Sequence, residues 1–179
     1  MSISIYSMAI DTFAPMLRTL SNLLDKGAEH LRGQGKDPET LVNAKLAPDM
    51  FPLVKQVQIA CDHAKGAAAR LTGREPPKFE DNEQTLGELK SRIKRTLDYV
   101  EGVSSNDYEG AENRHIEFPL IDDLVLDVNG TQFLRDWALP HFYFHLVTAY
   151  DILRNQGVPI GKRDYLAHVG YAIHPKGKK

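Results

Sequence analysis

The chain has 179 residues, of which 42% are hydrophobic and 26% are charged, and its formal net charge is -2. This composition is typical of a soluble globular protein, so we expect a single domain over residues 1–179. It does not favour a nucleic-acid-binding protein, which needs a basic surface. It does not favour a membrane protein either, because no apolar run approaches the roughly 18 to 20 residues that span a bilayer.

The cysteine content and the N-terminal sequence bear on location. A single cysteine, Cys61, rules out an internal disulfide, which fits a reducing compartment. The N-terminal segment has no basic region, and Asp11 interrupts its apolar run, so we expect no signal peptide and a cytoplasmic protein. We interpret Lys176, Lys178 and Lys179 as a frayed, solvated end of the chain.

Apolar residues at three- and four-residue spacing predict a first long helix from about residue 4 to residue 31. These residues are Phe13, Met16, Leu17, Leu20, Leu24 and Leu31. Two glycines soon after residue 31 end this helix. A short helix over about residues 37–45 should follow, because Asp37 suits the N-cap and Pro38 suits the first turn.

Two more long helices are predicted from about residue 47 to 71 and from about residue 82 to 100. The first has an apolar face of Phe51, Val54, Val57, Cys61, Ala64, Ala68 and Leu71, and an adjacent inward face of Ile59, His63 and Ala67. The second has a stripe of Leu86, Leu89, Ile93, Leu97 and Val100. A segment with Gly73 and two prolines separates them.

The next part of the chain carries a loop and two short apolar patches. Residues 104–113 are polar, and the patches at 115–120 and 124–128 flank turn residues, which predicts a β-hairpin. A last long helix should run over about residues 131–155, followed by an irregular tail or a short turn. Four long amphipathic segments predict an all-α four-helix bundle, with the short helix and the hairpin as insertions.

The last long helix contains the most informative pattern, in which His141 and His145 are one turn apart. Residues at i and i+4 share a helix face, so both imidazoles can bind one metal ion. Pro140 cannot donate a backbone bond, so we expect a kink just before His141. Catalytic metal sites usually have three protein ligands, and His63 is the best third candidate because it lies mid-helix on an inward face.

The same histidines have a structural interpretation, in which each hydrogen-bonds a backbone carbonyl or a tyrosine, Tyr143 or Tyr150. The pattern lacks the glutamate of a zinc-protease HExxH motif, and no catalytic residue is assigned. Cys61 is interpreted as a core residue and not as a nucleophile. Asp62 and His63 are neighbours on a helix and point about 100° apart, so they should not form a dyad.

The last helix resembles the corresponding segment of the DinB/YfiT-like superfamily. The matching positions are His141, His145, Leu153, Gly157 and Pro159. The resemblance implies a four-helix bundle, often dimeric, with a three-histidine metal site whose third ligand comes from the second long helix, where this chain offers His63. The chain departs from many members in one respect, because Leu146-Val147-Thr148 replaces an Arg-Gly-Gln sequence after His145.

Nearly the whole chain is similar to the Domain of Unknown Function 1993 family. Residues 46–73, 79–93 and 138–166 look like the signature stretches of that family. The resemblance implies the same bundle fold and a homodimer, but it implies no function. In this family asparagine is often found at the position of His141. The histidine at this position makes a three-histidine site possible in this chain.

Two functional hypotheses follow. In the first, His63, His141 and His145 bind a divalent ion, zinc or nickel, because these metals suit imidazole ligands. Some members of the superfamily are thiol-dependent transferases, so the resemblance implies a low-molecular-weight thiol as ligand. In the second, the protein is a non-catalytic dimeric bundle that binds a small molecule or a partner protein, and the histidines are structural.

Overall fold

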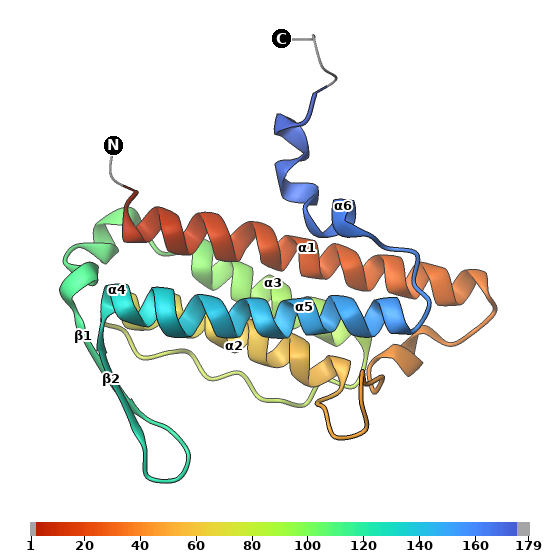
Figure 1. Ribbon diagram of the computed structural model, residues 1–179, viewed down its shortest axis with the longest axis horizontal. Coiled ribbons are helices and arrows are strands. Elements are labelled where there is room, and N and C mark those ends of the chain that lie inside the picture. The colour runs from red at the N-terminus through yellow and green to blue at the C-terminus, as the bar shows by residue number, and fades with distance from the viewer. Residues whose placement is uncertain (1–2, 175–179) are drawn as a thin grey trace.

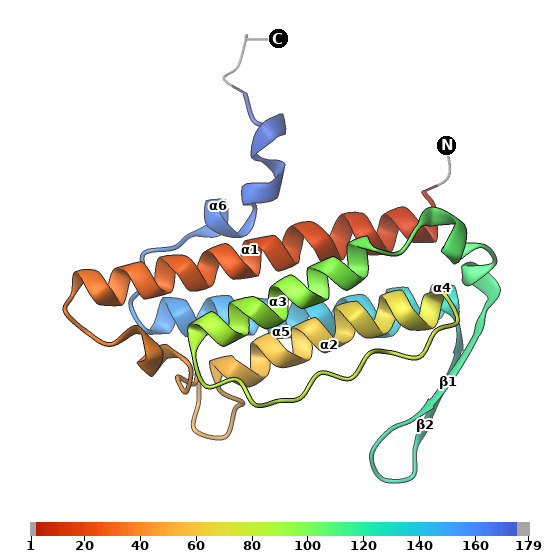
Figure 2. The same cartoon turned by 180° about the vertical axis from the view of Figure 1, so that it is seen from behind.

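Four helices of at least 16 residues dominate the computed structural model, which describes residues 3–174. They are α1 (Ile5–Gly33), α2 (Leu53–Leu71), α3 (Leu86–Glu101) and α5 (Leu139–Asn155). Figures 1 and 2 show these helices packed lengthwise, with a two-stranded antiparallel sheet extending from one end. No helix among residues 3–174 combines the length and the apolarity that a membrane crossing requires.

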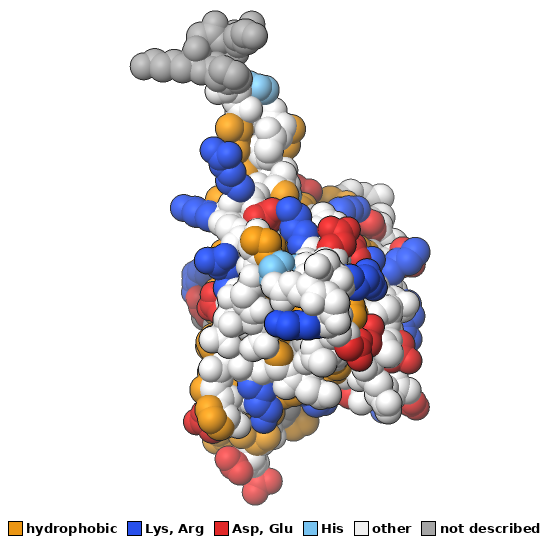
Figure 3. All heavy atoms as spheres, turned by 90° about the vertical axis from the view of Figure 1, so that its right-hand side faces the viewer, with side chains coloured by type: hydrophobic (Ala, Val, Ile, Leu, Met, Phe, Trp, Pro, Cys, Tyr) orange, Lys and Arg blue, Asp and Glu red, His pale blue; other side chains and the backbone are white. Residues whose placement is uncertain are grey.

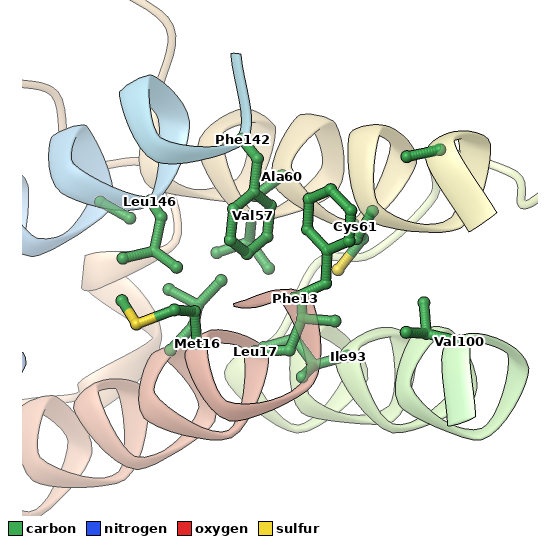
Figure 4. Close-up of a cluster of buried hydrophobic side chains, with 14 of the residues drawn as sticks. Phe13, Met16, Leu17, Val57, Ala60, Cys61, Ile93, Val100, Phe142 and Leu146 are labelled. Carbon is green, nitrogen blue, oxygen red and sulfur yellow. The ribbon is translucent and has the colours of Figure 1, made fainter. Parts of the chain in front are cut away.

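The hydrophobic core lies between the four long helices. Figure 4 shows Phe13 of α1, Val57 of α2, Ile93 of α3 and Leu146 of α5 pointing toward one another. The rings of Phe13 and Phe142 meet edge to face at 5.0 Å between centroids. Burying one such side chain stabilises the fold by about 1.5–3 kcal/mol, so this shared core holds the helices in register.

Two long helices begin later than the sequence predicts. The second starts at Leu53 with Pro52 as its N-cap, because the residue before a proline disfavours helical geometry. Phe51 therefore lies outside the helix and is 57% exposed instead of lining its apolar face. The third starts at Leu86, where Thr85 and Glu88 form a capping box that satisfies the first backbone N–H groups.

An extended segment joins α2 to α3 and runs along the outside of the helices (Figure 2). Arg92 of α3 is fully buried and anchors this segment. Its Nη1 donates to the carbonyl of Glu80 at 3.0 Å and to the carboxylate of Glu83 at 3.1 Å. Its Nη2 pairs with Asp62 of α2 at 2.8 Å. This network ties α2, α3 and the segment between them into one unit.

The short elements lie where the sequence predicts them, but the helix expected over about residues 37–45 is only a 3₁₀ turn, η1 (Pro38–Leu41). It begins after Asp37, as expected, and the side chain of Asp37 accepts from the N–H of Glu39. Two further turns, η2 (Ser105–Tyr108) and η3 (Ala111–Asn113), occupy the expected loop. The expected hairpin is confirmed as β1 (His115–Pro119) paired with β2 (Val125–Asn129).

The helical stretch before His141 differs from the expected simple kink. After α4 (Gly130–Gln132), the segment η4 (Phe133–Ala138) is π-helical and leads directly into α5. The N–H of Leu139 bonds to the carbonyl of Leu134, five residues earlier. The change in geometry expected from Pro140 thus occurs as wide turns just before it, of a kind often found at functional sites.

The described part of the chain ends after α6 (Lys162–Tyr165) and a 3₁₀ segment, η5 (Ala167–Ala172), so residues 158–174 are more ordered than expected. The three terminal lysines lie outside the described residues. Figure 3 shows the end of the molecule opposite the hairpin, where basic and acidic side chains are intermingled. That face therefore carries no patch of a single charge.

Candidate metal centre

Helices α2 and α5 pack side by side (Figure 1). This packing brings the three predicted histidines together. The ring of His63 stacks on that of His141 at 4.6 Å between centroids, with 21° between the ring planes. It is also nearly parallel to the ring of His145, at 6.1 Å and 11°. His63, which is at least 78 positions away in the sequence, thus forms one imidazole cluster with the two histidines of α5.

Hydrogen bonds determine the tautomers of the two histidines on α5. Nδ1 of His141 lies 2.8 Å from the carbonyl oxygen of Trp137, and Nδ1 of His145 lies 2.8 Å from Oε1 of Gln56. Gln56 is held in this orientation because its Nε2 donates to the carbonyl of Phe51 at 3.0 Å. Since both acceptors are oxygens, both Nδ1 atoms carry a proton, and in the neutral form of each ring Nε2 is the nitrogen that has a free lone pair.

The environment keeps two of the imidazoles neutral. Burial, with smaller contributions from the nearby His141 and His145, lowers the pKa of His63 to about 3. Burial and the neighbouring His141 lower the pKa of His145 to about 4. Within residues 3–174, neither ring nitrogen of His63 has a hydrogen-bond partner. Neutral imidazole is the form that binds metal ions.

Solvent reaches the cluster from two sides. His141 and His145 line a surface hollow of about 380 Å³ together with Pro140 and Phe144. His63 lines a different pocket of about 260 Å³, whose walls include Trp137. The histidines therefore lie between two openings, each large enough to admit a small ligand.

The hairpin carries a second group of metal-ligand types that the sequence analysis missed. Within residues 3–174, only His115, Glu117 and Asp127 form a trio of His, Cys, Asp or Glu ligand atoms that all lie within 4.8 Å of one another. All three side chains are exposed, and Nε2 of His115 lies 2.8 Å from Asp127. The pairing of Glu117 with Asp127 across the strands brings these side chains together. The sequence analysis predicted the hairpin but not its register, so it did not reveal this group.

The ligand atoms of the three predicted histidines are not that close, because their rings lie face to face. Coordination of one ion by all three would therefore require the ring of His63 to turn out of the stack. The tautomers of the two α5 histidines and the closeness of the three rings fit a metal ion. The stacked orientation of the rings does not fit it.

Two neighbours of His63 have structural roles. Cys61 is fully buried in the core, and burial raises the pKa of its thiol to about 12, so it remains a thiol. This confirms its interpretation as a core residue. Asp62 pairs with Arg92 at 2.8 Å and with Lys65 at 3.0 Å, so its carboxylate belongs to the buried ion-pair network.

The sequence also matches a known family. The family described as "Domain of unknown function (DUF1993)" matches residues 5–166. The chain belongs to the DUF1993 family. This DUF1993 protein is also similar to a crystal structure of a DinB family member protein from Shewanella denitrificans, with 38% identity over 98% of this chain and 94% of that chain, and a TM-score of 0.84. No curated protein matches the chain.

Proposed function

We propose that this DUF1993 protein binds one divalent metal ion, zinc or nickel, through the Nε2 atoms of His63, His141 and His145. The tautomers of the two α5 histidines support this proposal most strongly. Metal-binding histidines usually donate their other ring nitrogen to a carbonyl, an amide or a carboxylate, and Trp137 and Gln56 supply these acceptors here. We also propose that the four long helices form a DinB-type bundle around this site.

A bound metal ion would lower the pKa of a thiol or a water molecule at its open position. We propose a thiol-dependent transferase on this basis and on the resemblance to the DinB superfamily. The contribution of the chain itself is to hold the imidazoles neutral and oriented. Trp137 packs against His141 and Phe144 packs against His145, with ring centroids at 4.2 and 5.2 Å, and these contacts help to orient the two imidazoles.

A second candidate is a non-catalytic binding module whose histidines are structural. It is favoured by the stack of His63 on His141 and by the hydrogen bonds of both α5 histidines to protein oxygens. These contacts hold the imidazoles without any metal ion. The two candidates therefore differ in whether the cluster retains a metal ion, and the experiment below separates them.

We further propose that the protein is a homodimer that uses the exposed face of α5. Tyr143, Phe144 and Val147 are exposed apolar residues on this helix, beside the histidines. A patch of this kind on a polar surface is typical of protein–protein contacts. A cytoplasmic location remains part of the proposal, and the single buried cysteine supports it.

Elemental analysis of tag-free protein, loaded with zinc or nickel and then desalted, tests the proposal. We expect about one ion per chain in the wild type, and its loss in the His145→Ala variant. The matched control is His115→Ala, which removes the imidazole of the hairpin group and should leave the metal content unchanged. Loss of metal in His115→Ala alone would assign the ion to the hairpin, and a wild type without metal would favour the binding module.

A further inference from the structure

A cleft leads from His63 toward the base of the hairpin. The pocket beside His63 and a larger pocket of about 460 Å³ share the residues Arg70, Pro76 and Phe118 in their walls. Arg70 therefore stands at the boundary of two adjacent pockets, and we call the pocket beside His63 the cleft. A ligand in this cleft would have one end beside His63 and the other end at Arg70.

Arg70 is placed to receive an anion in this cleft. It lies seven residues after His63 on α2, so both side chains are on one face of the helix. Its guanidinium lies 4.2 Å from the centre of the Phe118 ring. A Cβ atom at position 66 would approach Nη1 of Arg70 to 2.8 Å, so Gly66 leaves room for the guanidinium against the helix.

Arg70 also lacks a compensating charge nearby. Within residues 3–174, no carboxylate lies within 4.0 Å of its guanidinium, although the side chain is only partly exposed. Burial lowers the pKa of Arg70, and the more distant Glu75 opposes this effect only in part. A partly buried guanidinium gains most from a ligand that supplies the missing negative charge.

The other two arginines of the larger pocket already have partners. Arg74 pairs with Asp107 at 2.6 Å. Arg114 is held by backbone carbonyls, because its Nε donates to Leu71 at 3.1 Å and its Nη2 donates to Glu109 at 3.1 Å. Arg70 therefore offers a single positive charge to a ligand, which matches a monoanion better than a phosphate dianion.

We propose that this cleft binds a small organic acid, whose carboxylate pairs with Arg70 and whose apolar body lies against the aromatic wall formed by Phe118, Phe133 and Trp137. Guanidinium groups bind carboxylates through two parallel hydrogen bonds, and the aromatic walls match an apolar body. The far end of such an acid lies beside His63. Its role as the substrate of the metal site rests on the metal-binding function proposed above.

The fluorescence of Trp137, the single tryptophan of the chain, reports binding in this cleft. The probes are cyclohexanecarboxylate and its neutral isostere cyclohexanecarboxamide, added to full-length protein in the presence of a chelator. We expect a saturable change with the acid and none with the amide. The variant Arg70→Met should weaken binding of the acid at least about tenfold, and Arg70→Lys should weaken it less, because the charge remains and the planar fork is lost.

Arg95→Met is the matched control, because Arg95 stacks on Phe79 at 4.6 Å in a similar pair outside the cleft. This variant should bind the acid like the wild type. Absence of binding by the wild type, equal binding of acid and amide, or unchanged affinity in both Arg70 variants would overturn the proposal. Competition by inorganic phosphate as strong as that by the acid would overturn the assignment to a carboxylate.

Metal content measured on the same protein preparations before the chelator is added separates this inference from the proposed function. Protein that retains its metal ion but does not bind the acid contradicts the cleft and leaves the metal centre intact. Protein that binds the acid through Arg70 but retains no metal ion contradicts the metal centre and leaves the anion site. Arg70→Met should retain the metal content of the wild type, because Arg70 is not one of the proposed ligands.

Discussion

Gln56 is the residue that most directly controls the chemistry of His145. Its amide is oriented by the carbonyl of Phe51, and it presents Oε1 to Nδ1 of His145. An amide that turned freely would also present its NH₂ group, which selects the opposite tautomer. The backbone just before α2 therefore influences the proposed metal centre through the side chain of Gln56.

We predict that Gln56→Leu weakens zinc binding by about 10- to 100-fold, because His145 loses the acceptor that fixes its tautomer. Calorimetric titration of metal-free protein with zinc measures this change. Gln58→Leu is the control, since Gln58 is also a buried glutamine of α2 but bonds to Glu83 at 2.7 Å. Equal zinc affinity in Gln56→Leu and the wild type would show that Gln56 does not support the site.

The sequence predicts the imidazole cluster but not the residues that support it. His141 and His145 follow from their i,i+4 spacing, and His63 follows from its place on an inward helix face. Gln56 and Arg70 carry no comparable signal, because their roles depend on how α2 packs against α5 and the hairpin. Side-chain partners across elements are set by packing, which a single sequence does not encode as a local pattern.

At the scale of elements, the hydrophobic period predicts each long helix and the turn residues predict the hairpin. The errors lie at two helix starts, where local chemistry overrides the period. Because of Pro52, α2 begins only at Leu53, and because of the capping box of Thr85 and Glu88, α3 begins only at Leu86. The residues before α3 stay extended because the buried Arg92 binds them, which is a tertiary effect.

The exposed face of α5 yields a prediction about assembly. Phe144 is 60% exposed beside the histidines, and we expect Phe144→Glu to convert a dimer into a monomer by burying a charge in the contact. Light scattering coupled to size exclusion measures the mass. Ile121→Glu changes an equally apolar residue, 80% exposed on the hairpin turn, and should remain dimeric. A monomeric wild type, or a dimeric Phe144→Glu, would contradict the proposed contact.

At the scale of the whole molecule, the buried histidines link stability to pH. The pKa values of His63 and His145 are lowered in the folded state to about 3 and about 4, from an ordinary value of 6.5. Between these values the unfolded chain takes up protons that the folded chain excludes. The stabilisation is therefore complete above about pH 6.5 and is lost progressively as the pH falls toward 4 and then 3.

We predict that the free energy of unfolding of metal-free protein decreases as the pH is lowered from 6.5 to 4. Each histidine contributes up to about 1.4 kcal/mol per pH unit, which corresponds to one proton. Urea denaturation of the wild type, His63→Leu and His145→Leu in the presence of a chelator measures the slopes. Each variant should have a shallower slope than the wild type, and identical slopes in all three proteins would contradict the prediction.

The proposed metal centre depends most on the identity of the atoms that bind the metal ion. The X-ray absorption spectrum of nickel-loaded protein tests this directly, because it separates imidazole nitrogens from carboxylate oxygens. We predict three imidazole ligands in the wild type, and two in a His63→Ala variant. A spectrum with one imidazole and carboxylate oxygens would place the ion at His115, Glu117 and Asp127 of the hairpin and would contradict the proposed centre.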